Sequence, residues 1–297
     1  MQMNAPVDAI AAWNLPLVET RARSIGDILV ESGRLDAESA ARVAVTQRDR
    51  GLRFGEAAIS LGLASVADIE FALARQFEYP YLKAGDSGID ARVMVAYRPF
   101  GPVAEQMRSL RTALMVNLLR RPEAPRTVAV LSSARGEGRS FIAANLAVVF
   151  SQLGERTLLI DADLRHPGQH LLFGLGERQG LSNLLLGRVG LECIARVPQF
   201  RSLSVLGAGS QAPNPQELLA GPRLSQLLER AAAQFDVVIV DTPAAGETAD
   251  GQIVASRTGA GLLVTRRGRT LARPLQQLRR SLRDSGASVL GTVLNDG

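Results

Sequence analysis

Hydrophobic positions follow two different patterns along the chain. Residues 24–76 carry apolar residues at helical spacing, whereas from residue 105 onwards short, nearly continuous apolar runs alternate with amphipathic stretches. Such runs are typical of strands buried on both faces of a parallel sheet. We expect strands over residues 127–133, 156–163, 203–209, 235–243, 261–267 and 288–295. The pattern predicts an α/β domain with a doubly wound, mostly parallel sheet, preceded by a small helical domain.

The helical part contains an internal repeat, in which residues 24–47 align without gaps with residues 53–76. Three residues recur at one constant offset, namely Gly26, Gly33 and Gln47 in the first copy and Gly55, Gly62 and Gln76 in the second. Asp36 and Ser65 stand at the positions of helix N-caps. Each copy therefore predicts a short helical hairpin that is too small to fold alone and packs against its twin.

These patterns divide the chain into a flexible arm over residues 1–20, a tandem-repeat domain over 21–82, a linker over 83–104 and the sheet domain over 105–297. We expect the linker to be irregular because it is rich in Gly and Pro and lacks clear periodicity. No apolar run approaches the roughly 18 residues of a membrane span, and no signal peptide is recognisable, so we expect a cytoplasmic protein. A single cysteine, Cys193, agrees with a reducing compartment.

A glycine-rich loop follows the first expected strand of the sheet domain. Gly136 and Gly138 allow backbone N–H groups to converge on a phosphate, and the helix expected after them adds the positive end of its dipole. Ser140 stands where a hydroxyl ligates Mg²⁺. Phosphate loops usually begin with glycine and carry lysine after the last glycine, whereas this chain has Ser133 and Arg139. Alone, the loop is equally compatible with a plain glycine-rich turn.

Carboxylates follow two other expected strands, with Asp161 and Asp163 after one and Asp241 after another. Because the carboxyl ends of parallel strands meet at one edge of a sheet, these side chains should lie near the phosphate loop. There they can hold Mg²⁺, directly or through water, and accept a proton from a nucleophile. The combination predicts a site for a nucleotide and Mg²⁺.

Three stretches, "SSARGEGRS", "LLIDADLR" and "IVDTP", are similar to the Walker A, A′ and B motifs of the bacterial tyrosine kinases, a family of P-loop NTPases. The likeness runs from Glu105 to Asn295 and is to the cytoplasmic kinases of chain-length-determinant systems for exopolysaccharide, of the EpsG type. It implies ATP binding by Arg135, Gly136, Glu137, Gly138, Arg139, Ser140 and Phe141, with Asn295 at the adenine edge. It further implies metal binding by Ser140, Asp161 and Asp241, and catalytic roles for Asp161, Asp163, Asp241 and Arg139.

The same resemblance implies an assembly and a partner. Glu105, Arg108 and Arg111 reproduce the family's oligomerisation motif at helical spacing, although they also suit a charged surface. We therefore expect a homo-oligomer. The implied partner is an inner-membrane chain-length determinant, a polysaccharide co-polymerase, which would place the chain at the periphery of the inner membrane; no nucleic acid is expected.

The repeat domain resembles the MshEN-type N-terminal domain of type II secretion and pilus ATPases, whose paired motifs bind cyclic di-GMP. The implied contacts are Arg53, Gly55, Gly62, Gln76, Gly26, Gly33 and Gln47. The first copy departs from the pattern because Ser24 occupies the position of the arginine. A docking role without a ligand is therefore an equal alternative.

The basic residues are nearly all arginine, since Lys83 is the single lysine among 34 basic residues. At Arg139 the planar guanidinium can still grip a phosphate, but it does not reproduce the compact ammonium that follows the transferred phosphoryl group, so turnover should fall. Residues 266–283 are rich in arginine and contain no acid, as in a solvated helix face or a surface for anionic lipid or an acidic partner.

Three functions from different classes fit the sequence. The first is a tyrosine kinase that regulates exopolysaccharide polymerisation, chain length and export. The family phosphorylates a tyrosine cluster at its C-terminus, whereas the three tyrosines of this chain, Tyr79, Tyr81 and Tyr97, all lie at or before the expected linker, so we expect no autophosphorylation of a tail. The second is a regulatory ATP-binding module that phosphorylates nothing. The third, a ParA- or MinD-like positioning ATPase, ranks last because its loop carries an early lysine where this chain has Ala134.

Overall fold

The computed structural model describes residues 23–76, 82, 88–119, 126–176 and 178–296. The chain forms two compact units that divide between Tyr79 and Pro80. The arm expected over residues 1–20, and Tyr79, Tyr81 and Lys83, lie outside the described residues. Over the described ranges, no helix has the length and apolar character needed to cross a bilayer.

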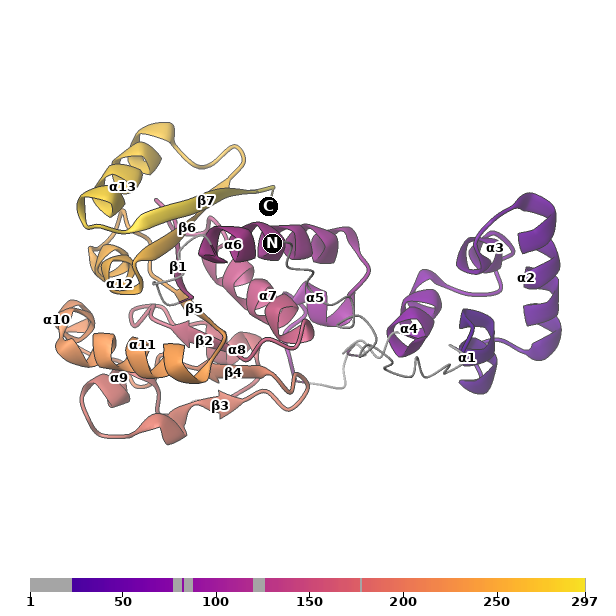
Figure 1. Ribbon diagram of the computed structural model, residues 1–297, viewed down its shortest axis with the longest axis horizontal. Helices are drawn as coiled ribbons and strands as arrows, with labels where there is room; N and C mark the ends of the chain where they lie inside the picture. The colour runs from indigo at the N-terminus through magenta and orange to yellow at the C-terminus, as the bar shows by residue number, and fades with distance from the viewer. Residues whose placement is uncertain (1–22, 77–81, 83–87, 120–125, 177, 297) are drawn as a thin grey trace, which may run out of the picture. The chain divides into compact units, whose positions relative to one another are not determined.

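The first unit consists of two helical hairpins, as the repeat predicts (Figure 1). Its helices are α1 (Ile25–Glu31), α2 (Ala37–Arg50), α3 (Phe54–Ser60) and α4 (Val66–Gln76). The expected caps are present: the Asp36 carboxylate accepts the Ser39 N–H at 2.7 Å, and the Ser65 hydroxyl accepts the Asp68 N–H at 3.2 Å. Gly33 and Gly62 end the first helix of each hairpin at φ 68° and 66°, which favours glycine.

The second unit is built on a seven-stranded sheet in the order β3-β4-β2-β5-β1-β6-β7. The strands are β1 (Thr127–Leu131), β2 (Thr157–Asp161), β3 (Ala195–Arg196), β4 (Leu203–Leu206), β5 (Val237–Asp241), β6 (Ala260–Arg266) and β7 (Ser288–Asn295). All pairs are parallel except β3 with β4. The expected strands and sheet type are confirmed, while β3 was missed because two residues without an apolar run give no signal.

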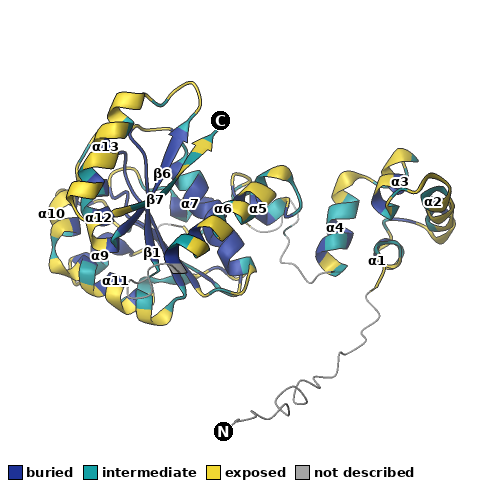
Figure 2. Ribbon diagram, turned by 45° about the horizontal axis from the view of Figure 1, so that its top comes forward, coloured by how far each residue is buried: buried dark blue, intermediate teal, exposed yellow. Residues whose placement is uncertain are grey.

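Helices cover both faces of this sheet, and alternate strand residues feed two cores. Val128 and Val130 of β1 face a core shared with α5 (Met94–Tyr97), α6 (Pro102–Leu119), α7 (Arg139–Gln152) and α8 (Gln169–Leu172). Ala129 and Leu131 face a core shared with α9 (Leu181–Leu185), α10 (Pro215–Ala220), α11 (Pro222–Gln234), α12 (Asp250–Thr258) and α13 (Ala272–Asp284). Figure 2 shows the buried strands between helices whose outer faces are exposed. The layers are those of a P-loop NTPase fold.

The segment expected to be a linker, residues 83–104, differs from the prediction over its described part. Val93, Val95 and Ala96 are fully buried in the core of the second unit. The Asn145 side chain of α7 accepts the Val95 N–H at 3.1 Å and donates to the Arg92 carbonyl at 3.0 Å. The described part of the segment therefore packs as part of the sheet domain. The sequence did not predict this packing because the segment shows no helical or strand periodicity.

Candidate active site

The register of the sheet brings the phosphate loop and the acidic residues to one edge. Val130 of β1 pairs with Asp241 of β5, and Asp241 pairs with Asp161 of β2. The loop after β1 and the segment after β2 therefore flank the end of β5. The sequence predicted this neighbourhood correctly, because parallel strands end at a common edge.

The phosphate loop runs from β1 to α7 and is held from inside by Glu137. This carboxylate is fully buried; it accepts the Ala134 N–H at 2.9 Å and the Ser133 hydroxyl at 3.3 Å. Gly138 has φ 101°, and a Cβ there would lie 2.3 Å from Nδ2 of Asn295. Asn295 itself donates to the Glu137 carbonyl at 3.2 Å. Glu137 thus shapes the loop with its side chain, and Asn295 lies beside the loop.

Arg139, in the position of the usual lysine, is 7% exposed and makes contacts within the protein. Its Nε donates to the Thr242 carbonyl at 2.8 Å, and its Nη1 donates to the Ala134 carbonyl at 2.9 Å and to the Ser132 hydroxyl. A planar guanidinium held at two nitrogens has a fixed orientation. Arg139 therefore ties the end of β5 to the phosphate loop.

Asp161 is fully buried, and its carboxylate accepts backbone N–H groups from Asp163 at 3.1 Å and from Gly168 and Gln169 at 2.9 Å each. Burial, followed by the neighbouring Asp241 charge, raises the pKa of Asp161. The carboxylate shapes the turn after β2. The same turn orients Asp163, which is 7% exposed and accepts the His166 N–H at 2.9 Å.

Asp241 is also fully buried, and burial raises its pKa although the side chains of Ser140 and Gln169 lower it. The Gln169 amide donates to its Oδ2 at 2.8 Å, whereas Oδ1 has no hydrogen-bond partner among the described residues. An unpartnered buried carboxylate oxygen beside the Ser140 hydroxyl suits Mg²⁺, which takes oxygen ligands. The residues present therefore fit the implied metal. Gln169 was missed because no sequence motif marks it.

An open hollow of about 270 Å³ lies over these residues. It is lined by Arg135, Gly136, Gly138, Arg139, Ser140, Phe141, Asp163, His166, Ala244 and Glu247. Asp163 lines the hollow, whereas Asp161 and Asp241 are not part of its lining. Of the three acids, Asp163 is therefore the one that borders the hollow, while Asp161 and Asp241 are fully buried beside it.

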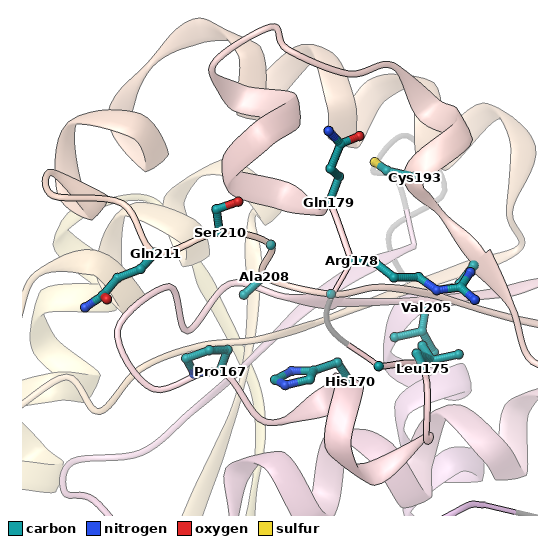
Figure 3. A pocket seen from close by; sticks show the side chains of 14 residues that line it. Pro167, His170, Leu175, Arg178, Gln179, Cys193, Val205, Ala208, Ser210 and Gln211 are labelled. Atoms are coloured by element: carbon teal, nitrogen blue, oxygen red, sulfur yellow. The ribbon is translucent and has the colours of Figure 1, made fainter.

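A second cavity, of about 490 Å³, lies beyond the turn after β2 (Figure 3). Pro167 comes from that turn, His170 lies on α8, and Ser210 and Gln211 follow β4. The two hollows therefore border the same short segment, with His166 in one lining and Pro167 in the other. Sequence reasoning did not anticipate this cavity because its lining comes from segments that carry no motif.

The residues of the expected oligomerisation motif lie on α6 and contact their own chain. Arg108 pairs with Glu105 at 2.7 Å and donates to the Pro99 carbonyl at 2.6 Å. Arg111 donates to the Val149 carbonyl, near the end of α7, at 2.7 Å. Glu105 remains 70% exposed. The motif therefore has roles inside the fold, whatever it does between subunits.

In the first unit, a groove of about 920 Å³ brings together residues of both repeat copies. Gly26 and Gln47 of the first copy line it with Arg53 and Gln76 of the second, whereas Gly33, Gly55 and Gly62 are not part of its lining. At two of the shared glycines, the packing of neighbouring side chains leaves little room for a Cβ. A Cβ at Gly26 would lie 3.1 Å from the Phe54 ring, and one at Gly55 would lie 2.8 Å from Ile69.

Comparison with known proteins agrees with the geometry of the second unit. No family model matches the chain. It is 35% identical over 209 residues to the tyrosine-protein kinase YwqD of Bacillus subtilis (strain 168), a match covering 70% of this chain and 87% of that protein. It is 37% identical over 193 residues to the tyrosine-protein kinase ptk of Acinetobacter johnsonii, covering 65% of this chain. The chain spans only 26% of the length of that relative.

A solved structure of a tyrosine kinase domain also resembles this chain. The kinase domain of the Escherichia coli tyrosine kinase ETK superposes with a TM-score of 0.65 and 32% sequence identity, covering 68% of this chain and 79% of that domain. This share is close to that of the sheet unit, residues 80–297.

Proposed function

The chain belongs to the bacterial tyrosine kinases, and from this premise we propose that it transfers the γ-phosphoryl group of ATP to the hydroxyl of a protein tyrosine. The observation that carries the proposal is the register of the strands, in which Asp161 pairs with Asp241 and Asp241 pairs with Val130 of the strand that leads into the phosphate loop. The proposal is supported by the hollow over this edge, which is lined by the phosphate loop, Ser140 and the Asp163 carboxylate, with Asp241 buried next to Ser140.

The residues divide the chemistry between them. The N–H groups of the phosphate loop and of the first turn of α7 hold the phosphates. Ser140 and Asp241 would hold Mg²⁺, with Asp161 behind them; when bound, the ion offsets charge on the phosphate oxygens. Asp163 accepts the proton of the tyrosine hydroxyl. The tyrosine oxygen then bonds to the γ-phosphorus, while the bond between the γ-phosphorus and the bridging oxygen of the β-phosphate breaks and ADP leaves. Asn295, beside the loop, is proposed to meet the adenine edge.

We propose further that the kinase regulates exopolysaccharide polymerisation, chain length and export as a homo-oligomer docked on an inner-membrane chain-length determinant. The likeness of its motifs to kinases of such systems supports this. A regulatory ATP-binding module that transfers nothing is the second candidate. It is favoured by the contacts that hold the Arg139 guanidinium within the protein.

The groove of the first unit supports a regulatory input. Arg53 and Gln76 from one copy and Gly26 and Gln47 from the other line a single hollow. We propose that it takes cyclic di-GMP, with Arg53 on a phosphate or guanine. A protein-docking role for the same surface is the alternative, since two of the shared glycines have packing reasons of their own.

The test is to incubate the full chain with labelled ATP and Mg²⁺, with and without tyrosine-containing cytoplasmic peptides of a chain-length determinant. Phosphotyrosine and released phosphate are measured together. The kinase proposal expects phosphotyrosine that disappears in Asp163→Asn and persists in Arg279→Ala, an exposed arginine of α13. Phosphate release alone would support the regulatory module, and the absence of both products would overturn the proposed function.

A further inference from the structure

Several arginines stand around the phosphate loop, and their contacts separate them by role. Arg135 belongs to the loop, and Arg139 is the first residue of α7 after it. Arg165 follows β2, Arg266 is the last residue of β6, and Arg269 follows that strand. Phosphoryl transfer needs a cation that can contact the phosphate oxygens as charge moves between them. In most phosphate loops the lysine that is replaced here by Arg139 supplies it.

Three of these arginines are committed to protein acceptors. Arg139 is held at Nε and Nη1, as described above. Arg165 pairs with the buried Asp250 at 2.8 Å. Arg266 donates to the Gly136 carbonyl at 3.0 Å and so supports the loop from the β6 side. None of the three can follow a moving phosphoryl group without giving up these bonds.

The remaining two differ in position. The guanidinium of Arg269 lies over Gly136, since a Cβ there would be 3.0 Å from its Nη1, yet Arg269 does not line the hollow. By strand order, β6 lies on the side of β1 away from the acidic residues of β5 and β2. Arg135 is exposed and lines the hollow together with Ser140 and Asp163. Within the described ranges its guanidinium has no hydrogen-bond or ion-pair partner.

We propose that this loop divides the work of the usual lysine between two arginines: Arg139 clamps the loop to β5, and Arg135 supplies the mobile cation for the transferred phosphoryl group. The inference rests on the proposed ATP-dependent function. Arg135 has the required properties, because its long side chain starts in the loop itself and its donors are free to contact a γ-phosphate near Asp163.

The proposed roles of Arg135 and Arg139 predict different effects of their substitution on ATP turnover and on the melting temperature. Arg135→Ala should lower turnover by roughly ten- to a hundredfold, the effect of one charge-assisted hydrogen bond, and leave the melting temperature of the nucleotide-free chain unchanged. Mg-ADP affinity should hold, since the lost contact is to the γ-phosphate, while Arg135→Lys should restore part of the turnover. Arg139→Ala should lower the melting temperature without any nucleotide, because it removes the side-chain donor of the Thr242 carbonyl and one of the two donors of the Ala134 carbonyl.

The experiment measures steady-state ATP turnover, Mg-ATP and Mg-ADP affinity and thermal melting for the full chain and these variants, with Arg279→Ala as the matched control. Unchanged turnover in Arg135→Ala would overturn the inference, as would an Arg139→Ala variant that melts like the parent but has lost all turnover. If the parent chain itself neither binds nor turns over Mg-ATP, the proposed function fails instead, so the two failures are distinguishable.

Discussion

Gly138 is the position at which a single methyl group should damage the phosphate loop most. A Cβ there meets two obstacles, a backbone at φ 101° and the Asn295 Nδ2 at 2.3 Å. The positive φ costs a non-glycine residue about 1–2 kcal/mol. Displacing Asn295 also breaks its bond to the Glu137 carbonyl, which contributes about 1 kcal/mol. We therefore expect Gly138→Ala to lower the free energy of unfolding by about 2–3 kcal/mol.

Gly154 provides the matched control. It has φ 92°, but a Cβ there would find nothing within 4 Å, so Gly154→Ala should cost only the backbone part, about 1–2 kcal/mol. The double change Gly138→Ala with Asn295→Ala should be less damaging than the sum of the two single changes, because the clash is gone. Urea unfolding of the full chain, followed by circular dichroism, measures all four free energies. Equal losses for Gly138→Ala and Gly154→Ala would refute the contact argument.

Four further outcomes are expected. Asp161→Ala should abolish Mg²⁺-dependent ATP binding measured by calorimetry. Because the folded-state pKa values of Asp161 and Asp241 are raised, their contribution to stability is complete below the ordinary value of 3.8 and is lost as pH rises toward and past neutrality. Melting temperatures without nucleotide should therefore fall over that range less in Asp161→Asn than in the parent. Charge reversal at Arg108 and Arg111 should shift ATP-bound oligomers toward monomer in sedimentation, and should also lower stability because both arginines donate to carbonyls of their own chain. Arg53→Ala should eliminate cyclic di-GMP binding in calorimetry.

Each of these can fail in a recognisable way. ATP affinity indifferent to both Mg²⁺ and the Asp161 change would remove the metal assignment. An identical pH slope in Asp161→Asn would mean that other groups set the pH dependence. An unchanged sedimentation profile would remove the α6 motif from the assembly argument, and the absence of heat with the full chain at near-millimolar cyclic di-GMP would leave the docking role of the groove.

The parts of the site that the sequence predicted are those encoded by strand ends. Apolar runs locate the strands, and the residues after them, Asp161, Asp163 and Asp241, must meet at one edge. What the sequence did not predict depends on side-chain direction. Nothing in the chain marks Gln169 as the residue that bridges the turn after β2 to Asp241, or shows that Glu137 turns into the loop.

The same distinction explains the errors in the fold. The described part of the expected linker packs through Val93, Val95 and Ala96, but these few apolar residues lie too close together to display a period. The two-residue β3 is fixed by pairing with β4 rather than by its own composition. Both features depend on tertiary contacts, which local propensity does not contain.

The first unit has a further property that follows from one hydrogen bond. The Gln76 side chain, at the end of α4, donates to the Arg23 carbonyl, just before α1, at 3.0 Å. Helix α1 packs on α4 as α2 packs on α3, so the first and last residues of the repeat lie close together, just as the end of the first copy lies next to the start of the second near Gly51. The four helices form a closed ring in which chain order is interchangeable. A circular permutant that begins at α3, ends at α2 and joins Gln76 to Arg23 by a short linker should therefore keep the same helix neighbours and the same groove.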